Sequence, residues 1–145
     1  MSLLNELYQE MIIDHSVSPR NEGRLATPTH FAEAYNATCG DELALGLWVS
    51  GDCIMDVKFY AQGCSISKAS GSMMTEKIKH MAVGEALEFS KNFQKMLQGE
   101  ELQSLDEGAM GDLVALLGVR QFPLRVKCAT LAWHALENAL KFPVR

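Results

Sequence analysis

The chain has 145 residues, of which 48% are hydrophobic and 21% charged, and its formal net charge at neutral pH is −5. A chain of this length and composition fits one folded domain with its own apolar core, and it is too apolar for a disordered protein. The acidic balance disfavours nucleic acid as a partner, and no apolar run approaches the roughly 18 residues that a membrane span needs.

The sequence predicts a helix, then a small sheet, then helices only. The expected elements in chain order are a helix at 3–15, strands at 31–35, 43–49 and 53–61, and helices at 65–80, 83–97, 112–118 and 124–141. The turn at Ser50-Gly51-Asp52 joins the last two strands as an antiparallel hairpin. This order is typical of the α+β class, here a small three-stranded antiparallel sheet packed by helices in one domain over residues 1–145.

One acidic connection between helices is expected, and two charged residues are expected at helix ends. Residues 99–112 hold five acidic side chains and no basic one, which predicts a solvated connection. Asp112 is expected to cap the short helix that ends at Gly118. His15 is expected to end the first helix, where a cation suits the negative end of the helix dipole.

The sequence contains four cysteines, Cys39, Cys53, Cys64 and Cys128. The N-terminal segment has no basic stretch ahead of an apolar one, so we expect no signal peptide and a reducing, cytoplasmic location, in which disulfides are rare. No Cys-x-x-Cys pair is present, which disfavours a zinc knuckle or a thioredoxin motif. Cys53 alternates in phase with Met55 and Val57, and we interpret it as a packed structural thiol.

The other three cysteines are predicted to lie at the ends of elements. Cys39 lies between two strands in Thr38-Cys39-Gly40-Asp41, Cys64 opens the first long helix after the sheet, and Cys128 lies in the first turns of the last helix. Helix N-termini favour thiolates, which are both nucleophiles and metal ligands. Three thiolates and the carboxylate of Asp41 would complete a tetrahedral site that suits zinc, although iron also binds thiolates. The residues therefore do not decide which metal would bind. The spacing of the cysteines also fits three thiols that share no site.

Motifs along nearly the whole chain carry a family resemblance. They are Leu7-Tyr8-Gln9-Glu10 through Asp14-His15, Ser18-Pro19-Arg20-Asn21, Ala37-Thr38-Cys39-Gly40-Asp41, Gly63-Cys64-Ser65-Ile66-Ser67 and Phe122-Pro123-Leu124-Arg125-Val126-Lys127-Cys128-Ala129-Thr130-Leu131-Ala132-Trp133. Together they resemble a SufU-type member of the IscU/NifU N-terminal family of iron–sulfur cluster assembly proteins. The resemblance implies an IscU/SufU-like fold.

The resemblance also implies a metal site and a sulfur acceptor. The positions that match the family's metal ligands, which hold zinc in this branch, are Cys39, Asp41, Cys64 and Cys128. Cys39 matches the thiol that receives sulfur from a SufS-type cysteine desulfurase, which is implied to supply a substitute ligand that releases Cys39. Arg125 and Lys127 match basic positions that could stabilise a persulfide. Downstream SUF assembly proteins or apoproteins are the implied recipients, with neither nucleic acid nor membrane as a partner.

Three hypotheses for the function follow. The first is a zinc-dependent sulfur acceptor, that is, a sulfurtransferase that serves iron–sulfur cluster assembly. The second is a scaffold on which an iron–sulfur cluster is built and passed to apoproteins, and the third is a zinc-stabilised binding module. Lys127 stands where the scaffold branch has a histidine, and an acidic insert lies at 99–112. Both features favour the first reading.

Overall fold

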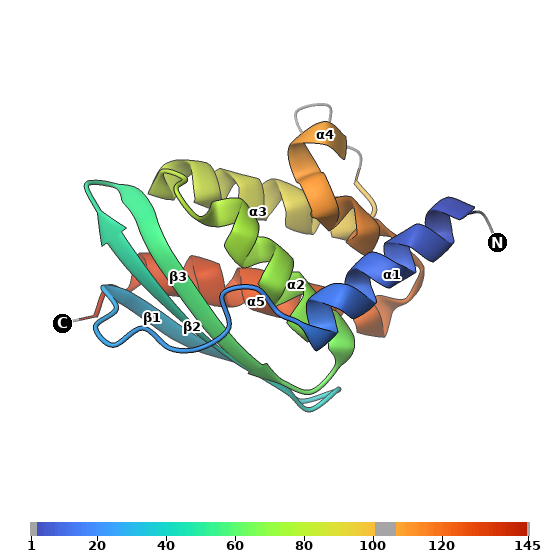
Figure 1. Cartoon of the computed structure of the whole chain (residues 1–145), viewed down its shortest axis with the longest axis horizontal. Coiled ribbons are helices and arrows are strands. Elements are labelled where there is room, and N and C mark those ends of the chain that lie inside the picture. Colours follow the sequence, from blue (N-terminus) through green and yellow to red (C-terminus); the bar gives the residue numbers. More distant parts are fainter. Residues whose placement is uncertain (1–2, 101–106, 145) are drawn as a thin grey trace.

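The computed structural model describes residues 3–100 and 107–144. Its elements in chain order are α1 (Leu3–Val17), β1 (His30–Asn36), β2 (Asp41–Ser50), β3 (Cys53–Gln62), α2 (Ser65–Ile78), α3 (Val83–Leu97), α4 (Glu107–Met110), the 3₁₀ helix η1 (Gly111–Gln121) and α5 (Pro123–Lys141). Figure 1 shows a sheet covered by helices. The predicted order and the α+β class are confirmed, and no helix of the described part is long and apolar enough to cross a membrane.

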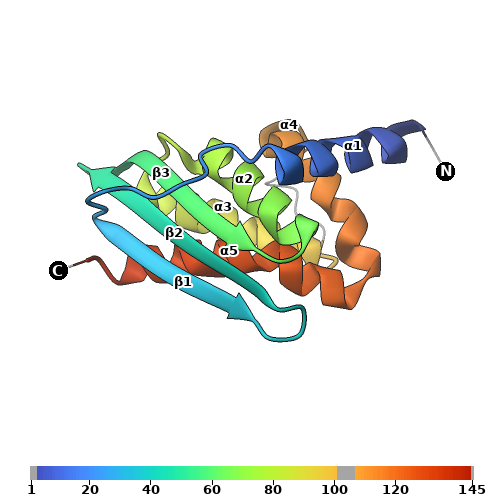
Figure 2. The ribbon, with the colours of Figure 1, turned by 60° about the horizontal axis from the view of Figure 1, so that its bottom comes forward.

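The sheet is antiparallel with the strand order β1-β2-β3, as the alternating pattern predicted. Helices α2 and α5 cover one face, and α3 packs against α5 (Figure 2). The core residues of β2 and β3 are fully buried, among them Leu45, Leu47 and Phe59, and Ala32 and Ala34 of β1 are partly buried against this core. The free edge of β3 is partly satisfied by the chain after α1, because the amide of Gly23 donates to the carbonyl of Phe59. Within the described residues, the helices therefore pack against one face of the sheet.

A bulge changes the predicted phase of β3. Trp48 pairs with Asp56, but Val49 pairs with Ile54, so Met55 has no partner of its own on β2. Ile54 is fully buried as a result and Met55 is 38% exposed. The expected apolar face through Cys53 and Met55 was therefore wrong. The sequence alternation continued smoothly across this position, and a bulge leaves no mark on alternation alone.

His15 and Asp112 have other roles than the predicted ones. His15 is buried, and its Nδ1 and Nε2 lie 2.7 Å from Ser72 Oγ and 3.0 Å from Asp112 Oδ2. Asp112 therefore joins η1 to α1 instead of capping a helix, and α1 continues past His15 to Val17. Part of the predicted connection at 99–112 is helical (α4 and the start of η1), and residues 101–106 of it lie outside the described residues. A contact between segments about 100 residues apart leaves no periodic signal in the sequence.

Gly71 allows α2 to lie directly on the sheet. A Cβ at this position would come within 2.7 Å of Phe59 Cε2, and the Phe59 ring is itself buried. We expect Gly71→Ala to lower the free energy of unfolding by roughly 1–3 kcal/mol through overpacking, although alanine is the better helix former by about 1 kcal/mol. Urea denaturation measures the change. Gly84→Ala in α3 is the matched control, because a Cβ there would meet no atom of the described residues within 4 Å, apart from its chain neighbours and its own helix backbone. Equal stabilisation by both substitutions would contradict the close packing of Gly71 on Phe59.

Candidate functional site

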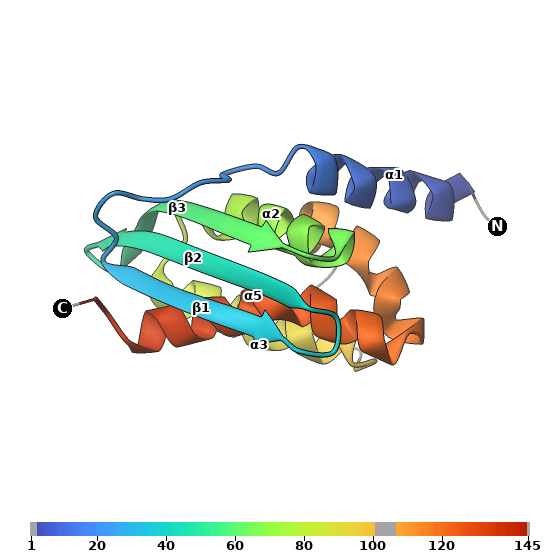
Figure 3. The same ribbon diagram turned by 90° about the horizontal axis from the view of Figure 1, so that it is seen from below.

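Three segments of the chain meet at one end of the sheet. They are the β1–β2 turn with Cys39, the β3–α2 junction with Cys64, and the first turns of α5 with Cys128 (Figure 3). The antiparallel hairpin places Asn36 opposite Asp41, and Glu42 opposite Gln62 on β3, so the turn and the end of β3 are neighbours. The chain thus brings together the residues that the sequence placed at element ends.

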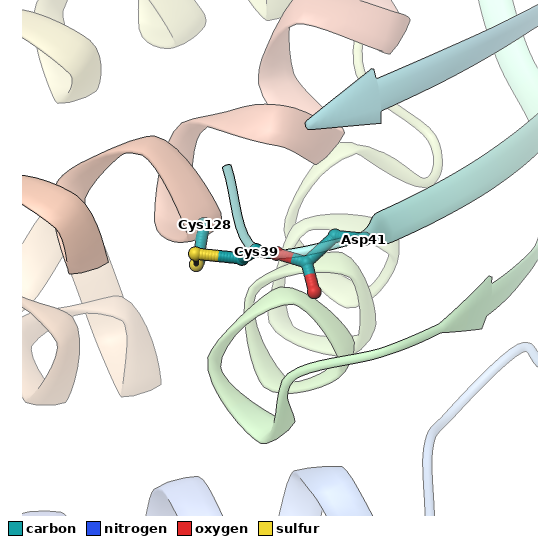
Figure 4. Close-up of side chains that lie close together, drawn as sticks. All are labelled: Cys39, Asp41 and Cys128. Atoms are coloured by element: carbon teal, nitrogen blue, oxygen red, sulfur yellow. Dashed lines mark hydrogen bonds between the residues drawn. The ribbon is translucent and has the colours of Figure 1, made fainter. Parts of the chain in front are cut away.

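Cys39, Asp41 and Cys128 form a compact group of donor atoms. One sulfur or carboxylate oxygen from each residue lies within 4.8 Å of the others. The Cys128 thiol is 3.3 Å from Cys39 Sγ, and Figure 4 shows these sulfur atoms side by side, with Asp41 beside them at the start of β2. Cys128 and Asp41 are buried, whereas Cys39 is half-buried in a turn whose other residues are exposed. Access to the group is therefore from the side of Cys39.

The Asp41 carboxylate is held at both oxygens. The backbone N–H of Cys64 donates to Oδ1 at 2.7 Å, and the Ser67 hydroxyl donates to Oδ2 at 2.8 Å. Burial raises the pKa of this carboxyl, but these two hydrogen bonds, a bond with Cys128 and the charge of Arg125 outweigh it and hold the pKa below its ordinary value. Asp41 is therefore an anion. A Cβ at Gly63 would overlap Asp41 Oδ1, so a glycine with φ +123° is required beside it.

Cys64 lies at the edge of the group. Its Sγ accepts a hydrogen bond from the N–H of Ile66 at 3.3 Å, which makes Cys64 the N-cap of α2. The same sulfur accepts from Arg125 Nη1 at 3.0 Å. Electrostatic interaction with the neighbouring Cys64, and to a smaller extent with Cys128 and Cys39, raises the pKa of Arg125. Cys64 is thus anchored to Asp41 by its backbone, while its sulfur faces a guanidinium.

Cys128 and Cys39 differ in their surroundings. Burial, followed by hydrogen bonds with Cys39 and Asp41, raises the pKa of the Cys128 thiol far above its ordinary value. Cys39 lies in a turn held by Asn36, whose carbonyl accepts from Gly40 N at 2.8 Å and whose side-chain oxygen accepts from Thr38 N at 3.2 Å. Cys39 is half-buried and Cys128 is fully buried, so Cys39 has the more accessible sulfur.

The structure separates two other candidates from this group. Lys127 is exposed, and its side chain makes no hydrogen bond or ion pair within the described residues. Cys53 begins β3, at the opposite end of that strand from Cys64, and its thiol lies 3.5 Å from the His80 carbonyl. In the part of the chain that the structure describes, no histidine joins Cys39, Asp41 and Cys128.

The donor set fits a soft divalent cation. Two thiols and a buried carboxylate converge within 4.8 Å, a spacing compatible with bonds of about 2.0–2.3 Å to one zinc ion. As thiolates these groups would carry several negative charges, and Arg125 is the one cationic side chain hydrogen-bonded to a cysteine sulfur among the described residues. A divalent cation would supply the missing positive charge. The fourth predicted ligand, Cys64, is fixed beside the group by its backbone.

Ser67 and Asn36 are site residues that the sequence did not assign. Ser67 is fully buried and contacts both Asp41 and the Cys128 carbonyl, while Asn36 holds the Cys39 turn and its amide lies 3.9 Å from Cys128 Sγ. One signal for Ser67 was available: it follows the N-cap by three residues, and side chains at that spacing share a helix face. Asn36, which directly follows the strand predicted at 31–35, gave no such signal.

Comparisons show that the chain is similar to known proteins over most of its length. Residues 7–129 match the NifU-like N-terminal domain family. The chain is 46% identical over 137 residues to the zinc-dependent sulfurtransferase SufU of Bacillus subtilis, covering 94% of this chain and 91% of that protein. It is 40% identical over 141 residues to the iron–sulfur cluster assembly scaffold protein IscU of Streptococcus pyogenes, covering 97% and 87%.

The fold of the chain also matches a solved structure. The crystal structure of an iron–sulfur cluster assembly scaffold protein for the SUF system from Fervidobacterium islandicum superposes with a TM-score of 0.85 at 39% identity, covering 94% of this chain and 98% of that one. The family model matches most of the sequence, and relatives with more than 30% identity extend over nearly all of it. The chain therefore belongs to the NifU-like N-terminal domain family.

Proposed function

We propose that this protein is a zinc-dependent sulfur acceptor that takes persulfide sulfur from a cysteine desulfurase for iron–sulfur cluster assembly. The observation that carries the proposal is the group of Cys39, Asp41 and Cys128, with an accessible Cys39, in a chain similar to a zinc-dependent sulfurtransferase over almost its whole length. Zinc would be held by Cys39, Asp41, Cys64 and Cys128. When bound, it keeps cysteine ligands as thiolates at neutral pH.

Sulfur transfer needs a nucleophilic thiolate that can meet a partner's persulfide. The Cys39 thiolate attacks the outer sulfur of the desulfurase cysteine persulfide, and the sulfur–sulfur bond of that persulfide breaks. The desulfurase cysteine leaves as a thiolate, and Cys39 carries the new persulfide, so no external oxidant or reductant is consumed. Cys39 suits this role because it lies in the exposed turn, whereas Cys128 is buried.

Arg125 is the cation best placed to stabilise the negative charge of sulfur in the site. Its guanidinium already donates to the Cys64 sulfur at 3.0 Å. Arg125 is itself exposed, so solvent screens part of its charge, and we expect Arg125→Ala to slow sulfur transfer by roughly 2- to 5-fold. Arg120→Ala on η1 is the matched control and should leave the rate unchanged, because among the described residues the Arg120 side chain donates only to a backbone carbonyl. Equal rates in wild type and Arg125→Ala would remove Arg125 from the mechanism.

Lys127 is proposed as a second, weaker contributor. Its side chain is exposed and makes no hydrogen bond or ion pair within the described residues, so its charge would act through solvent. Charges screened in this way contribute little. We therefore expect a smaller rate loss for Lys127→Ala than for Arg125→Ala.

Metal analysis and mass spectrometry test the proposed function. Protein purified under reducing conditions should contain about one zinc per chain, as a single four-ligand site implies, and no visible chromophore. After incubation with a SufS-type desulfurase and cysteine, the chain should gain the mass of one sulfur atom on Cys39. A brown chromophore without added sulfur would instead support the scaffold reading, which the similarity to IscU proteins favours. Zinc without sulfur acceptance would support a zinc-stabilised binding module.

The proposed partners follow from this chemistry. A cysteine desulfurase supplies the sulfur, and downstream SUF assembly proteins or apoproteins receive it. All of these are expected in the cytoplasm. Neither a membrane nor a nucleic acid is needed for the transfer, and the net charge of −5 suits a protein partner.

A further inference from the structure

Ser67 joins three of the chain segments that converge on the site. It lies on α2, its hydroxyl donates to Asp41 Oδ2 on β2 at 2.8 Å, and the same hydroxyl lies 3.3 Å from the Cys128 carbonyl on α5. The Ser67 side chain is fully buried, so water cannot replace these contacts. A single hydroxyl group thus links two predicted metal ligands, Asp41 and Cys128, to α2, the helix that a further predicted ligand, Cys64, caps.

We propose that Ser67 is a positioning residue for the metal site, which fixes the Asp41 carboxylate as a ligand. One Asp41 oxygen accepts the Cys64 amide and the other accepts the Ser67 hydroxyl, so the two donors together prevent rotation of the carboxylate. Each carboxylate oxygen can accept more than one partner, so both keep electron pairs for a cation. Partners of this kind orient a ligand, and their loss commonly weakens metal binding by about 10- to 100-fold.

The arrangement also divides the four proposed ligands into two sets. Asp41, Cys64 and Cys128 are connected through Ser67 and the Cys64 amide. Cys39 has no hydrogen bond to Ser67 or to the Cys64 amide: it lies in a turn that Asn36 closes through two hydrogen bonds to backbone amides, and its sulfur meets the other set only at Cys128, at 3.3 Å. Ser67 therefore holds the ligands that must stay in place while Cys39 reacts. This role rests on the metal site of the proposed function.

Ser67→Ala tests the role, with Ser70→Ala as the matched control. Ser70 lies one turn further along α2, is equally buried, and also joins α2 to α5, because its hydroxyl donates to the Ala129 carbonyl at 2.6 Å. It forms no hydrogen bond with Asp41 or with any cysteine. The two variants remove the same group from the same helix, and only one of them removes a donor from a proposed ligand.

Metal affinity and the visible spectrum of the Co²⁺-loaded protein are the readouts. We expect Ser67→Ala to weaken zinc binding about 10- to 100-fold in competition with a chelator, and to shift the Co²⁺ absorption bands, which depend on ligand type and geometry. Ser70→Ala should lower the metal-free unfolding temperature but keep both the affinity and the spectrum. The metal-free unfolding curve of Ser67→Ala shows that the variant is folded.

The outcomes separate this role from the proposed function. Wild-type affinity and spectrum in Ser67→Ala would overturn the positioning role while leaving the metal site intact. Equal loss of affinity in Ser70→Ala would also overturn it, because the effect would then come from packing of α2 on α5. Failure of the wild type to bind zinc or Co²⁺ would overturn the metal site itself.

Discussion

Cys39→Ser is expected to reduce the stimulation of a cognate cysteine desulfurase to the level of the desulfurase alone. Serine cannot form a persulfide, and the buried Cys128 cannot present its sulfur to a partner in its place. The substitution lies in an exposed turn, so the change in unfolding free energy should stay within about 1 kcal/mol. Steady-state sulfide or alanine production by the desulfurase measures the stimulation, and mass spectrometry measures sulfur bound to the chain. Zinc is expected to be partly retained, because the connected ligands Asp41, Cys64 and Cys128 stay in place and the serine oxygen or water can fill the fourth position poorly.

Cys53→Val is the matched control for this prediction. Cys53 is also a half-buried cysteine, but it lies at the other end of β3, and within the described residues its thiol donates only to the His80 carbonyl, at 3.5 Å. Valine is close to cysteine in volume, so folding, zinc content and sulfur transfer should match the wild type. Sulfur found on Cys53 or Cys128 but never on Cys39 would show that the acceptor is misassigned. An iron–sulfur chromophore on the chain in place of bound sulfur would favour the scaffold function.

The order of most elements could be predicted because each of these has a local signal, whereas α4 lies in the predicted connection at 99–112. Alternation of apolar residues marked β2 and β3, Pro123 marked the start of α5, and helical spacing marked α1. The structure differs where the deciding contact is not local. The bulge at Met55 reversed the phase of the first residues of β3, and the pairing of His15 with Asp112 joins segments 97 residues apart.

The site could be predicted in part, for the same reason. Residues at element ends are visible in the sequence, and three of the four predicted ligands do form a compact group. The sequence could not show that the Cys64 sulfur faces Arg125, because that contact depends on the angle between α2 and α5. It also could not show that Ser67 reaches Asp41 on β2. Contacts of this kind follow from the packing of elements, which no spacing within one segment encodes.

Cys64→Ser is expected to remove most of the bound zinc and the stability that zinc confers. Zinc at 1,000 times its dissociation constant would stabilise the folded wild type by about 4 kcal/mol, which corresponds to a rise in Tm of roughly 10–15 °C for a chain of this size. In the variant this rise should shrink to a few degrees. Metal analysis and thermal unfolding with and without zinc measure both effects.

The same substitution separates the metal role of Cys64 from its structural role. Cys64 caps α2 through its sulfur, and serine is a preferred N-cap residue, so the metal-free variant should be at least as stable as the metal-free wild type. A drop in Tm that appears only with zinc present then reports loss of a ligand. If the variant instead keeps full zinc occupancy and an unchanged rise in Tm, the Cys64 sulfur of the wild type is not a zinc ligand and stays with Arg125. The site would then consist of Cys39, Asp41 and Cys128 alone, with its remaining position open to a ligand from the partner.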